Sequence, residues 1–173
     1  MLQSAPLPSL PDPPLDSAGD IHAVPRADTR IYTDGEYLAQ NPTWHAEDAD
    51  WKCRYILEMI DRNQLAPRTL CEVGCGSGEI LVQLKWQLPA ACELIGYDIS
   101  PQAHALAVTR SAERLQFYLG DLTAQEAAHF DLILVIDLIE HVEDYYGFLR
   151  RLRPLSEYAI FHFPLDLSAY TVL

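Results

Sequence analysis

The sequence of 173 residues has few cysteines and no long apolar run. No stretch approaches the roughly 20 consecutive apolar residues that a membrane-spanning helix needs. The N-terminus lacks the basic start and apolar segment of a signal peptide. The four cysteines form no C-x-x-C pair and show no zinc-type spacing. These absences predict a cytoplasmic protein with reduced cysteines.

Basic residues are also scarce. The chain has 12 Lys and Arg against 25 Asp and Glu, and its formal net charge is -13. Such a surface repels phosphate backbones and anionic lipids. We therefore expect neither a nucleic-acid partner nor a membrane partner.

The N-terminal part differs in composition from the rest. Residues 1–30 hold six of the twelve prolines and show no helical or strand periodicity, which predicts a disordered leader. Residues 31–49 mix aromatic and polar side chains, among them Tyr37, Trp44 and His45. This segment is interpreted either as a lid over a site or as an arm packed on the outside. The chain that remains after these two segments, residues 50–173, is long enough for one domain.

From residue 50 onward, apolar strands alternate with helical patterns. This alternation predicts an α/β Rossmann-like fold, a three-layer sandwich around a mainly parallel sheet of about five strands. The predicted strands are 69–73, 93–98, 115–119, 130–136 and 158–163, and the predicted helices are 50–63, 78–88, 100–113 and 143–152.

A glycine-dense turn follows the first predicted strand. Glycines at 74, 76 and 78 let a ligand approach the backbone closely. Asp98, twenty residues beyond Gly78, ends the second strand, where a carboxylate can accept the hydroxyls of a ribose. Glu72 just before the turn disfavours a pyrophosphate and favours a cationic group. The pattern thus predicts a cationic nucleoside ligand.

The segment Glu72-Val73-Gly74-Cys75-Gly76-Ser77-Gly78 resembles the first motif of the class I S-adenosylmethionine-dependent methyltransferases. Gly120-Asp121 resembles the family's adenine-contacting pair, and residues 137–142 resemble the segment after strand four in its ubiquinone-biosynthesis-like, small-molecule branch. The resemblance implies methyl transfer from S-adenosyl-L-methionine to an unidentified small-molecule acceptor. The cofactor-binding residues that it implies are Glu72, Gly74, Cys75, Gly76, Gly78, Asp98, Ile99, Asp121, Leu122 and Asp137.

Catalysis by such a protein needs little beyond alignment of the acceptor with the methyl group. If the acceptor is a hydroxyl, His141 is the candidate catalytic base; its other interpretation is a residue that packs at a helix start. Asp137, Glu140 and His141 have the spacing of one face of a helical turn and could hold a divalent metal. No clear fourth ligand follows, so we expect no metal.

The resemblance also implies a seven-stranded sheet, whereas only ten residues follow Phe163. We expect a C-terminally incomplete sheet, through truncation, a completing second chain or a compact variant, with truncation favoured. The exposed last strand favours a homo-oligomer. The alternative functions are a non-catalytic S-adenosylmethionine-binding domain or a truncated remnant and, more distantly, a nicotinamide-dependent dehydrogenase.

Overall fold

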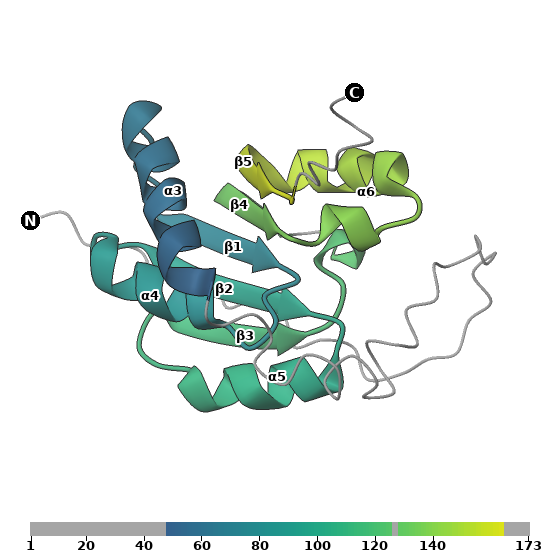
Figure 1. Ribbon diagram of the computed structural model, residues 1–173, viewed down its shortest axis with the longest axis horizontal. Helices are drawn as coiled ribbons and strands as arrows, with labels where there is room; N and C mark the ends of the chain where they lie inside the picture. Colours follow the sequence, from purple (N-terminus) through teal and green to yellow (C-terminus); the bar gives the residue numbers. More distant parts are fainter. Residues whose placement is uncertain (1–47, 126–127, 165–173) are drawn as a thin grey trace, which may run out of the picture.

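A computed structural model describes residues 48–125 and 128–164 of the chain (Figure 1). The predicted leader and most of the predicted arm or lid, with Tyr37, Trp44 and His45, lie outside the described residues. The helices are α3 (Ala49–Arg62), α4 (Glu79–Gln87), α5 (Pro101–Ala107) and α6 (Tyr145–Leu152), and the strands are β1 (Thr69–Val73), β2 (Glu93–Asp98), β3 (Leu115–Leu119), β4 (Phe130–Ile136) and β5 (Ser156–His162).

The five strands form one parallel sheet in the order β3-β2-β1-β4-β5. The chain moves outward from β1 through β2 to β3, then returns to the other side of β1 with β4 (Figure 1). The order of strands therefore reverses between β1 and β4, where ligands bind in open α/β sheets. The predicted α/β Rossmann-like architecture is confirmed.

Both faces of the sheet are covered, because successive residues of a strand point to opposite faces. In β4, Leu132 and Leu134 pack into a cluster with α3 and α4, whereas Ile133 and Val135 pack into a second cluster with α6. All four side chains are buried, and each buried leucine contributes about 1.5–3 kcal/mol to folding. This double burial explains why β4 is apolar along almost its whole length.

Helix α5 is shorter than predicted. Ser100 caps it by accepting a hydrogen bond from the Ala103 backbone N–H, and Pro101 occupies its first turn. The α-helix ends at Ala107 and a 3-10 turn, Val108–Arg110, follows. Within that turn the Thr109 hydroxyl donates to the Leu106 carbonyl at 2.7 Å, a local bond that competes with helix propagation. The prediction of a helix as far as residue 113 is therefore wrong.

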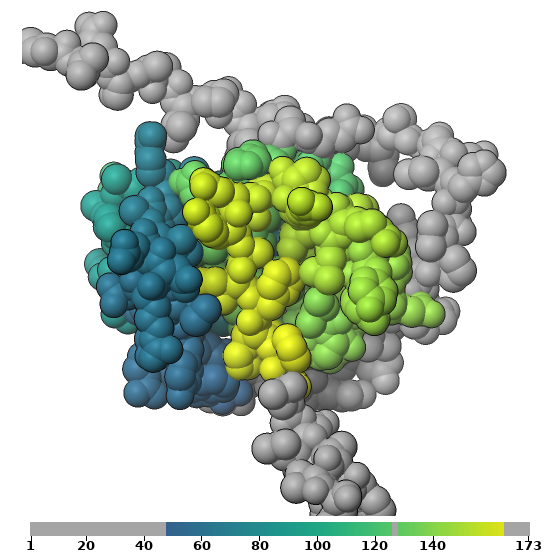
Figure 2. Space-filling view, turned by 90° about the horizontal axis from the view of Figure 1, so that it is seen from above, coloured from purple at the N-terminus to yellow at the C-terminus, as the bar shows by residue number. Residues whose placement is uncertain are grey.

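Strand β5 lies at one edge of the sheet, paired with β4. It begins two residues earlier than predicted, because Ser156 pairs with Phe130 at the start of β4. Its outer side reaches the molecular surface between α3 and α6 (Figure 2), and the residues Tyr158 and Phe161 are 48% and 37% exposed. Residues 165–173 lie outside the described part, so the predicted incompleteness of the sheet stays a prediction.

The four cysteines are free and buried, in line with the prediction that they are reduced core residues. Burial raises the pKa of the Cys53 thiol to about 12 and that of Cys92 to about 11, which makes both poor nucleophiles near neutral pH. Within 48–125 and 128–164, no helix is long and apolar enough to cross a lipid bilayer.

Candidate functional site

The carboxyl ends of the strands gather the acidic residues that the sequence singled out. Val73 at the end of β1 pairs with Tyr97 in β2 on one side and with Val135 in β4 on the other. This register brings Glu72 and Asp98 to the same edge of the sheet as Asp137, which follows β4 directly. The switch point of the sheet therefore carries three carboxyl groups.

The glycine turn is held against the end of β2. The backbone N–H groups of Gly74 and Cys75 both donate to the Tyr97 carbonyl, at 2.8 and 3.1 Å. Gly74 and Gly78 have φ angles of +72° and +80°, which favour glycine. A Cβ on Gly78 would also collide with the Phe117 ring. Both the conformation and the packing of the turn thus require glycine.

Arg110 fastens the far end of the turn. Its guanidinium donates to the Ser77 carbonyl and lies 3.4 Å from a carboxylate oxygen of Glu79 in the first turn of α4. A side chain that follows α5 therefore fixes the junction between the turn and α4. These contacts hold the end of the turn against α4.

Asp98 joins the turn through its side chain. One carboxylate oxygen accepts the Gly76 N–H at 2.7 Å, and the other accepts the Ser100 N–H at 2.8 Å. Burial raises the pKa of Asp98, while these two hydrogen bonds act in the opposite direction. The Ile99 backbone N–H also stabilises this carboxylate. A carboxylate offers about four acceptor sites, so about one remains for a donor such as a ribose hydroxyl.

Glu72 carries a buried oxygen that lacks a partner. Its side chain is only 2% exposed, and no described residue hydrogen-bonds to its Oε2 atom. Burial raises the pKa of Glu72 well above its usual range; Asp98 and Asp137 add to this rise, and Lys52 opposes it. An unsatisfied buried carboxyl oxygen is costly. Its place beside the glycine turn suits a positively charged donor from a ligand.

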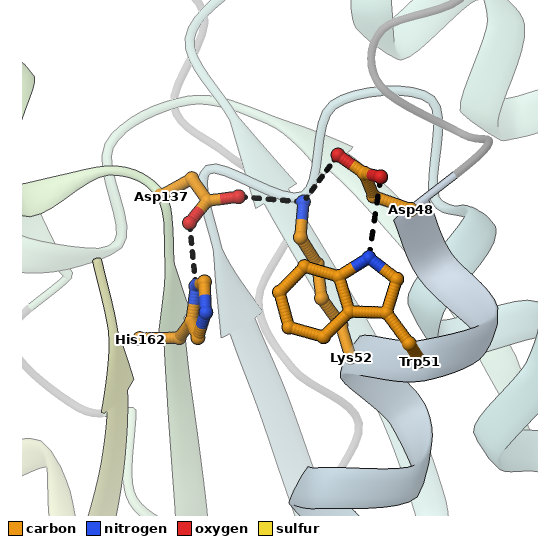
Figure 3. A network of polar contacts seen from close by, with 5 residues as sticks. All are labelled: Asp48, Trp51, Lys52, Asp137 and His162. Carbon is orange, nitrogen blue, oxygen red and sulfur yellow. Dashed lines mark hydrogen bonds and ion pairs between the residues drawn. The ribbon is translucent and has the colours of Figure 1, made fainter. Parts of the chain in front are cut away.

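Asp137 lies in a network of polar contacts (Figure 3). Its Oδ2 atom is 2.6 Å from Lys52 Nζ and its Oδ1 atom is 2.6 Å from His162 Nδ1. Lys52 Nζ also lies 3.7 Å from Asp48 Oδ2. The other carboxylate oxygen of Asp48, Oδ1, accepts a hydrogen bond from Trp51 Nε1 at 3.2 Å. Burial alone would raise the pKa of Asp137, but the bonds from Lys52 and His162 outweigh it and lower that pKa.

The other predicted cofactor-binding residues show fewer features of a ligand site. Asp121 is exposed and caps a 3-10 turn, Leu122–Ala124, by accepting the Thr123 N–H at 2.8 Å. Leu122 is fully buried in the cluster beneath α6, whereas Ile99 is 41% exposed just after Asp98. Cys75 is buried, which leaves its backbone as the part that a ligand could reach. Their cofactor roles stay predictions.

The segment after β4 differs from the helical turn assumed for a metal cluster. Asp137 has a φ of +50°, and Ile139–His141 forms a 3-10 turn in place of an α-helical one. Asp137, Glu140 and His141 consequently do not share one face of an α-helix. In the part of the chain that the structure describes, no three His, Cys, Asp or Glu side chains form a group able to hold a metal. The catalytic role of His141, which is exposed, stays a prediction.

The sequence-based interpretation missed Lys52 and His162. Lys52 is only 6% exposed in a helix whose buried face also carries Cys53 and Ile56, so a lysine on an apolar face was a usable signal. His162 ends β5, and a polar residue at the carboxyl end of a parallel strand was the other signal. Lys52 and His162 meet at Asp137 only because α3, β4 and β5 come together in the fold, so the spacing of residues along the sequence could not predict this contact.

Residues 44–168 match the family model described as a methyltransferase domain, over well more than half of the chain. The chain belongs to this methyltransferase-domain family. The prediction of a class I S-adenosylmethionine-dependent methyltransferase fold is thereby confirmed.

Curated relatives match the methyltransferase domain over part of its length. The ubiquinone biosynthesis O-methyltransferase of Aromatoleum aromaticum is 28% identical over 95 residues, which are 51% of this chain and 39% of that protein. The ajmaline N-methyltransferase of Rauvolfia serpentina is 32% identical over 103 residues, 55% of this chain and 34% of that protein. The chain thus matches less than half the length of each of these relatives.

Solved structures support the fold. The plantazolicin methyltransferase BpumL, in complex with a triazolic desmethylPZN analog and SAH, superposes with a TM-score of 0.53 at 22% identity. The match covers 75% of this chain and 49% of that one. Coclaurine N-methyltransferase, bound to N-methylheliamine and SAH, gives a TM-score of 0.50 at 23% identity, over 61% of this chain and 33% of that one.

Proposed function

We propose that this domain binds S-adenosyl-L-methionine at the carboxyl edge of its sheet and transfers the methyl group to a small-molecule acceptor. The observation that carries the proposal is the glycine turn beside two buried acids, Glu72 and Asp98. Family membership and relatives named as O- and N-methyltransferases support it. The acceptor would then offer a hydroxyl or an amine.

The proposed roles follow from the position of each group. The backbone of residues 74–78 holds the methionine part of the donor, and Glu72 offers its unpaired carboxyl oxygen to the ammonium, whose positive charge would favour the ionised carboxylate. Asp98 accepts a ribose hydroxyl through the acceptor site that its backbone donors leave open. Ile99, Asp121 and Leu122 form the adenine end, where Ile99 already offers exposed apolar surface.

Alignment of the acceptor with the methyl group supplies most of the rate acceleration in this proposal. The methyl donor carries its own leaving group, so the chain needs to position two substrates and receive a proton. His141, exposed on the 3-10 turn after β4, is the candidate base that was predicted from the sequence. Asp137 borders the same edge.

Calorimetric titration of the full chain with S-adenosyl-L-methionine tests the proposal. We expect binding by the wild type, and at least about tenfold weaker binding by Asp98→Ala, because hydrogen bonds to a charged acceptor contribute about 1.5–3 kcal/mol each. Asp61→Asn, on the exposed side of α3, is the matched control and should bind normally. Absence of binding by the wild type would exclude the proposed function.

A second candidate function is ligand binding without turnover. It would use the same glycine turn and buried acids, but no catalytic base. The two are separated by incubating the full chain with S-adenosyl-L-methionine and a panel of phenols, catechols and secondary amines. Release of S-adenosylhomocysteine above the rate without acceptor supports the enzyme; binding without release across the panel supports the binding domain.

Self-association and a cytoplasmic location form the last parts of the proposal. Among the described residues, β5 pairs with β4 on one side, and its exposed Tyr158 and Phe161 offer apolar surface to a second copy. Light scattering across a concentration series would detect the dimer.

The proposed cytoplasmic location rests on the four free cysteines, which suit a reducing compartment. Microscopy of a tagged full-length protein would check it.

A further inference from the structure

The chain brings a histidine and an aspartate together where β4 and β5 end. Ile136 pairs with His162, and the Asp137 N–H donates to the His162 carbonyl at 2.9 Å. The left-handed φ of +50° then lets the Asp137 carboxylate lie 2.6 Å from His162 Nδ1 (Figure 3). A non-glycine residue with positive φ is uncommon and is often found at functional sites.

The Asp137 carboxylate determines which imidazole nitrogen carries the proton. An ionised carboxylate accepts hydrogen bonds and cannot donate them, so Nδ1 must be the donor in this pair. In the neutral ring, Nε2 then carries a lone pair. None of the described residues hydrogen-bonds to Nε2, and the His162 side chain is 32% exposed. The ring therefore offers an oriented and reachable proton acceptor.

Charged and aromatic side chains surround the ring. Asp137 contacts His162 directly. Lys52 on α3 and Asp48 just before α3 lie next in the network, and the ring centroids of Trp51 and His162 are 5.3 Å apart. Two carboxylates and one ammonium give this group a net charge of about -1 when the imidazole is neutral. A proton on His162 would bring the net charge to zero.

The pair also lies beside the proposed donor site. Glu72, under the glycine turn, experiences the charges of Asp137, Lys52 and Asp98. Leu138, the residue after Asp137, lies against the glycine turn, since a Cβ on Gly74 would be only 3.0 Å from its side-chain carbons. His141 lies on the separate 3-10 turn that follows Asp137.

We propose that His162, oriented by Asp137, is the base that takes the proton of the methyl acceptor. The inference rests on the proposed function. The acceptor's lone pair forms the new bond to the methyl carbon, the carbon–sulfur bond breaks with its electron pair left on sulfur, and the acceptor's proton moves to Nε2. The imidazolium afterwards loses that proton to water. Asp137 is a positioning residue, and His162 is the catalytic one.

The test uses nuclear magnetic resonance of the histidine rings in the full chain, and needs no known acceptor. The pKa of His162 is measured in the complex with S-adenosyl-L-methionine and in the complex with S-adenosylhomocysteine, and His162→Gln assigns its signal. The two ligands differ by one methyl group and one positive charge on sulfur. A positive charge on sulfur near the ring disfavours the imidazolium, so the pKa should be measurably lower in the complex with S-adenosyl-L-methionine.

His129, exposed just before β4 at the opposite edge of the sheet, is the matched control and should keep the same pKa in both complexes. Equal pKa values for His162 in two verified complexes would overturn the inference and leave the proposed function standing. A shift of His141 in place of His162 would overturn it in favour of His141. If calorimetry shows that neither ligand binds, the proposed function and the inference fall together.

Two variants complete the test. Asp137→Asn should reduce the fraction of His162 with the proton on Nδ1, which nitrogen shifts report; an unchanged fraction would overturn the positioning role. With any acceptor that turns over, His162→Gln should lower kcat about 10²–10⁴-fold and leave the affinity for S-adenosyl-L-methionine within about twofold. An equal loss of affinity would show that His162 only supports the fold of the site.

Discussion

Replacing Glu72 with glutamine should stabilise the protein at neutral pH and weaken its binding of S-adenosyl-L-methionine. Glu72 is buried, its Oε2 lacks a partner among the described residues, and its pKa is raised, chiefly by burial and further by Asp98 and Asp137. Glutamine cannot ionise, so the variant avoids the free energy that burial of a titrating carboxyl costs, about 1.4 kcal/mol for each unit by which the folded chain raises the pKa. For a chain of this size each kcal/mol corresponds to about 2–4 °C in Tm.

The pH dependence gives the sign of this effect. Unfolding lets Glu72 ionise at its ordinary pKa of 4.5, whereas the folded chain holds the proton to higher pH. The unfolded state therefore binds fewer protons in the interval between the two pKa values, and stability falls as pH rises through it. Glu72→Gln lacks this loss, so its advantage in Tm over the wild type should be small at pH 4.5 and larger at pH 8.

Thermal unfolding followed by circular dichroism at both pH values measures the effect. Glu93→Gln, at the first residue of β2 and the opposite edge of the sheet, is the matched control and should change Tm by less than about 2 °C. A Glu72→Gln protein no more stable than the wild type at pH 8 would refute the reasoning. Unchanged affinity in calorimetry would separately remove Glu72 from the ligand site.

Other parts of the fold give shorter predictions. Gly78→Val should abolish binding and destabilise the domain by at least about 2 kcal/mol in denaturant unfolding, because it combines a φ of +80° with a collision against Phe117; native stability would contradict this. Leu134→Ala should cost about 2–5 kcal/mol in the same assay, since the side chain is fully buried; a cost below 1 kcal/mol would contradict its core role. Asp144→Ala should cost about 1 kcal/mol, because Asp144 accepts the Gly147 N–H at the start of α6; Asp144→Ser should recover most of it.

The sheet could be predicted from the sequence because its strands are short apolar runs between clear turn residues. The first four strands have the predicted bounds. Strand β5 carried a weaker signal, since Ser156 and Glu157 are polar and partly or fully exposed, and they join the strand through pairing with β4. Helix α5 ended early through a local hydrogen bond of Thr109, which helical periodicity does not reveal.

The candidate site likewise has parts that the sequence predicted and parts that it did not. The glycine turn and Asp98 were visible because the residue types and their spacing carry the conformational requirement. The contact of Asp137 with Lys52 and His162 was not visible, because α3, β4 and β5 come together only in the folded sheet. Aspartate adopts a positive φ more readily than most residues, but this preference does not single out Asp137 among the aspartates of the chain.

The structure also offers a competing place for a ligand. A hollow lined by Gln64, Pro67, Asp131 and Tyr158 opens at the opposite edge of the sheet. Asp131 there accepts the backbone N–H groups of Arg68 and Thr69, at 2.6 and 3.0 Å, so its carboxylate fastens the start of β1. No glycine turn or unsatisfied acid borders this hollow within the described residues, and we expect no donor binding in it.

The location of the methyl donor is the central claim, and a titration of backbone amide signals with S-adenosyl-L-methionine tests it most directly. The account predicts that the largest chemical-shift changes fall on residues 74–78 and on Asp98. It predicts little change at Arg68 and Asp131. The largest changes at Arg68 and Asp131, or no change at the glycine turn in a saturated sample, would contradict it.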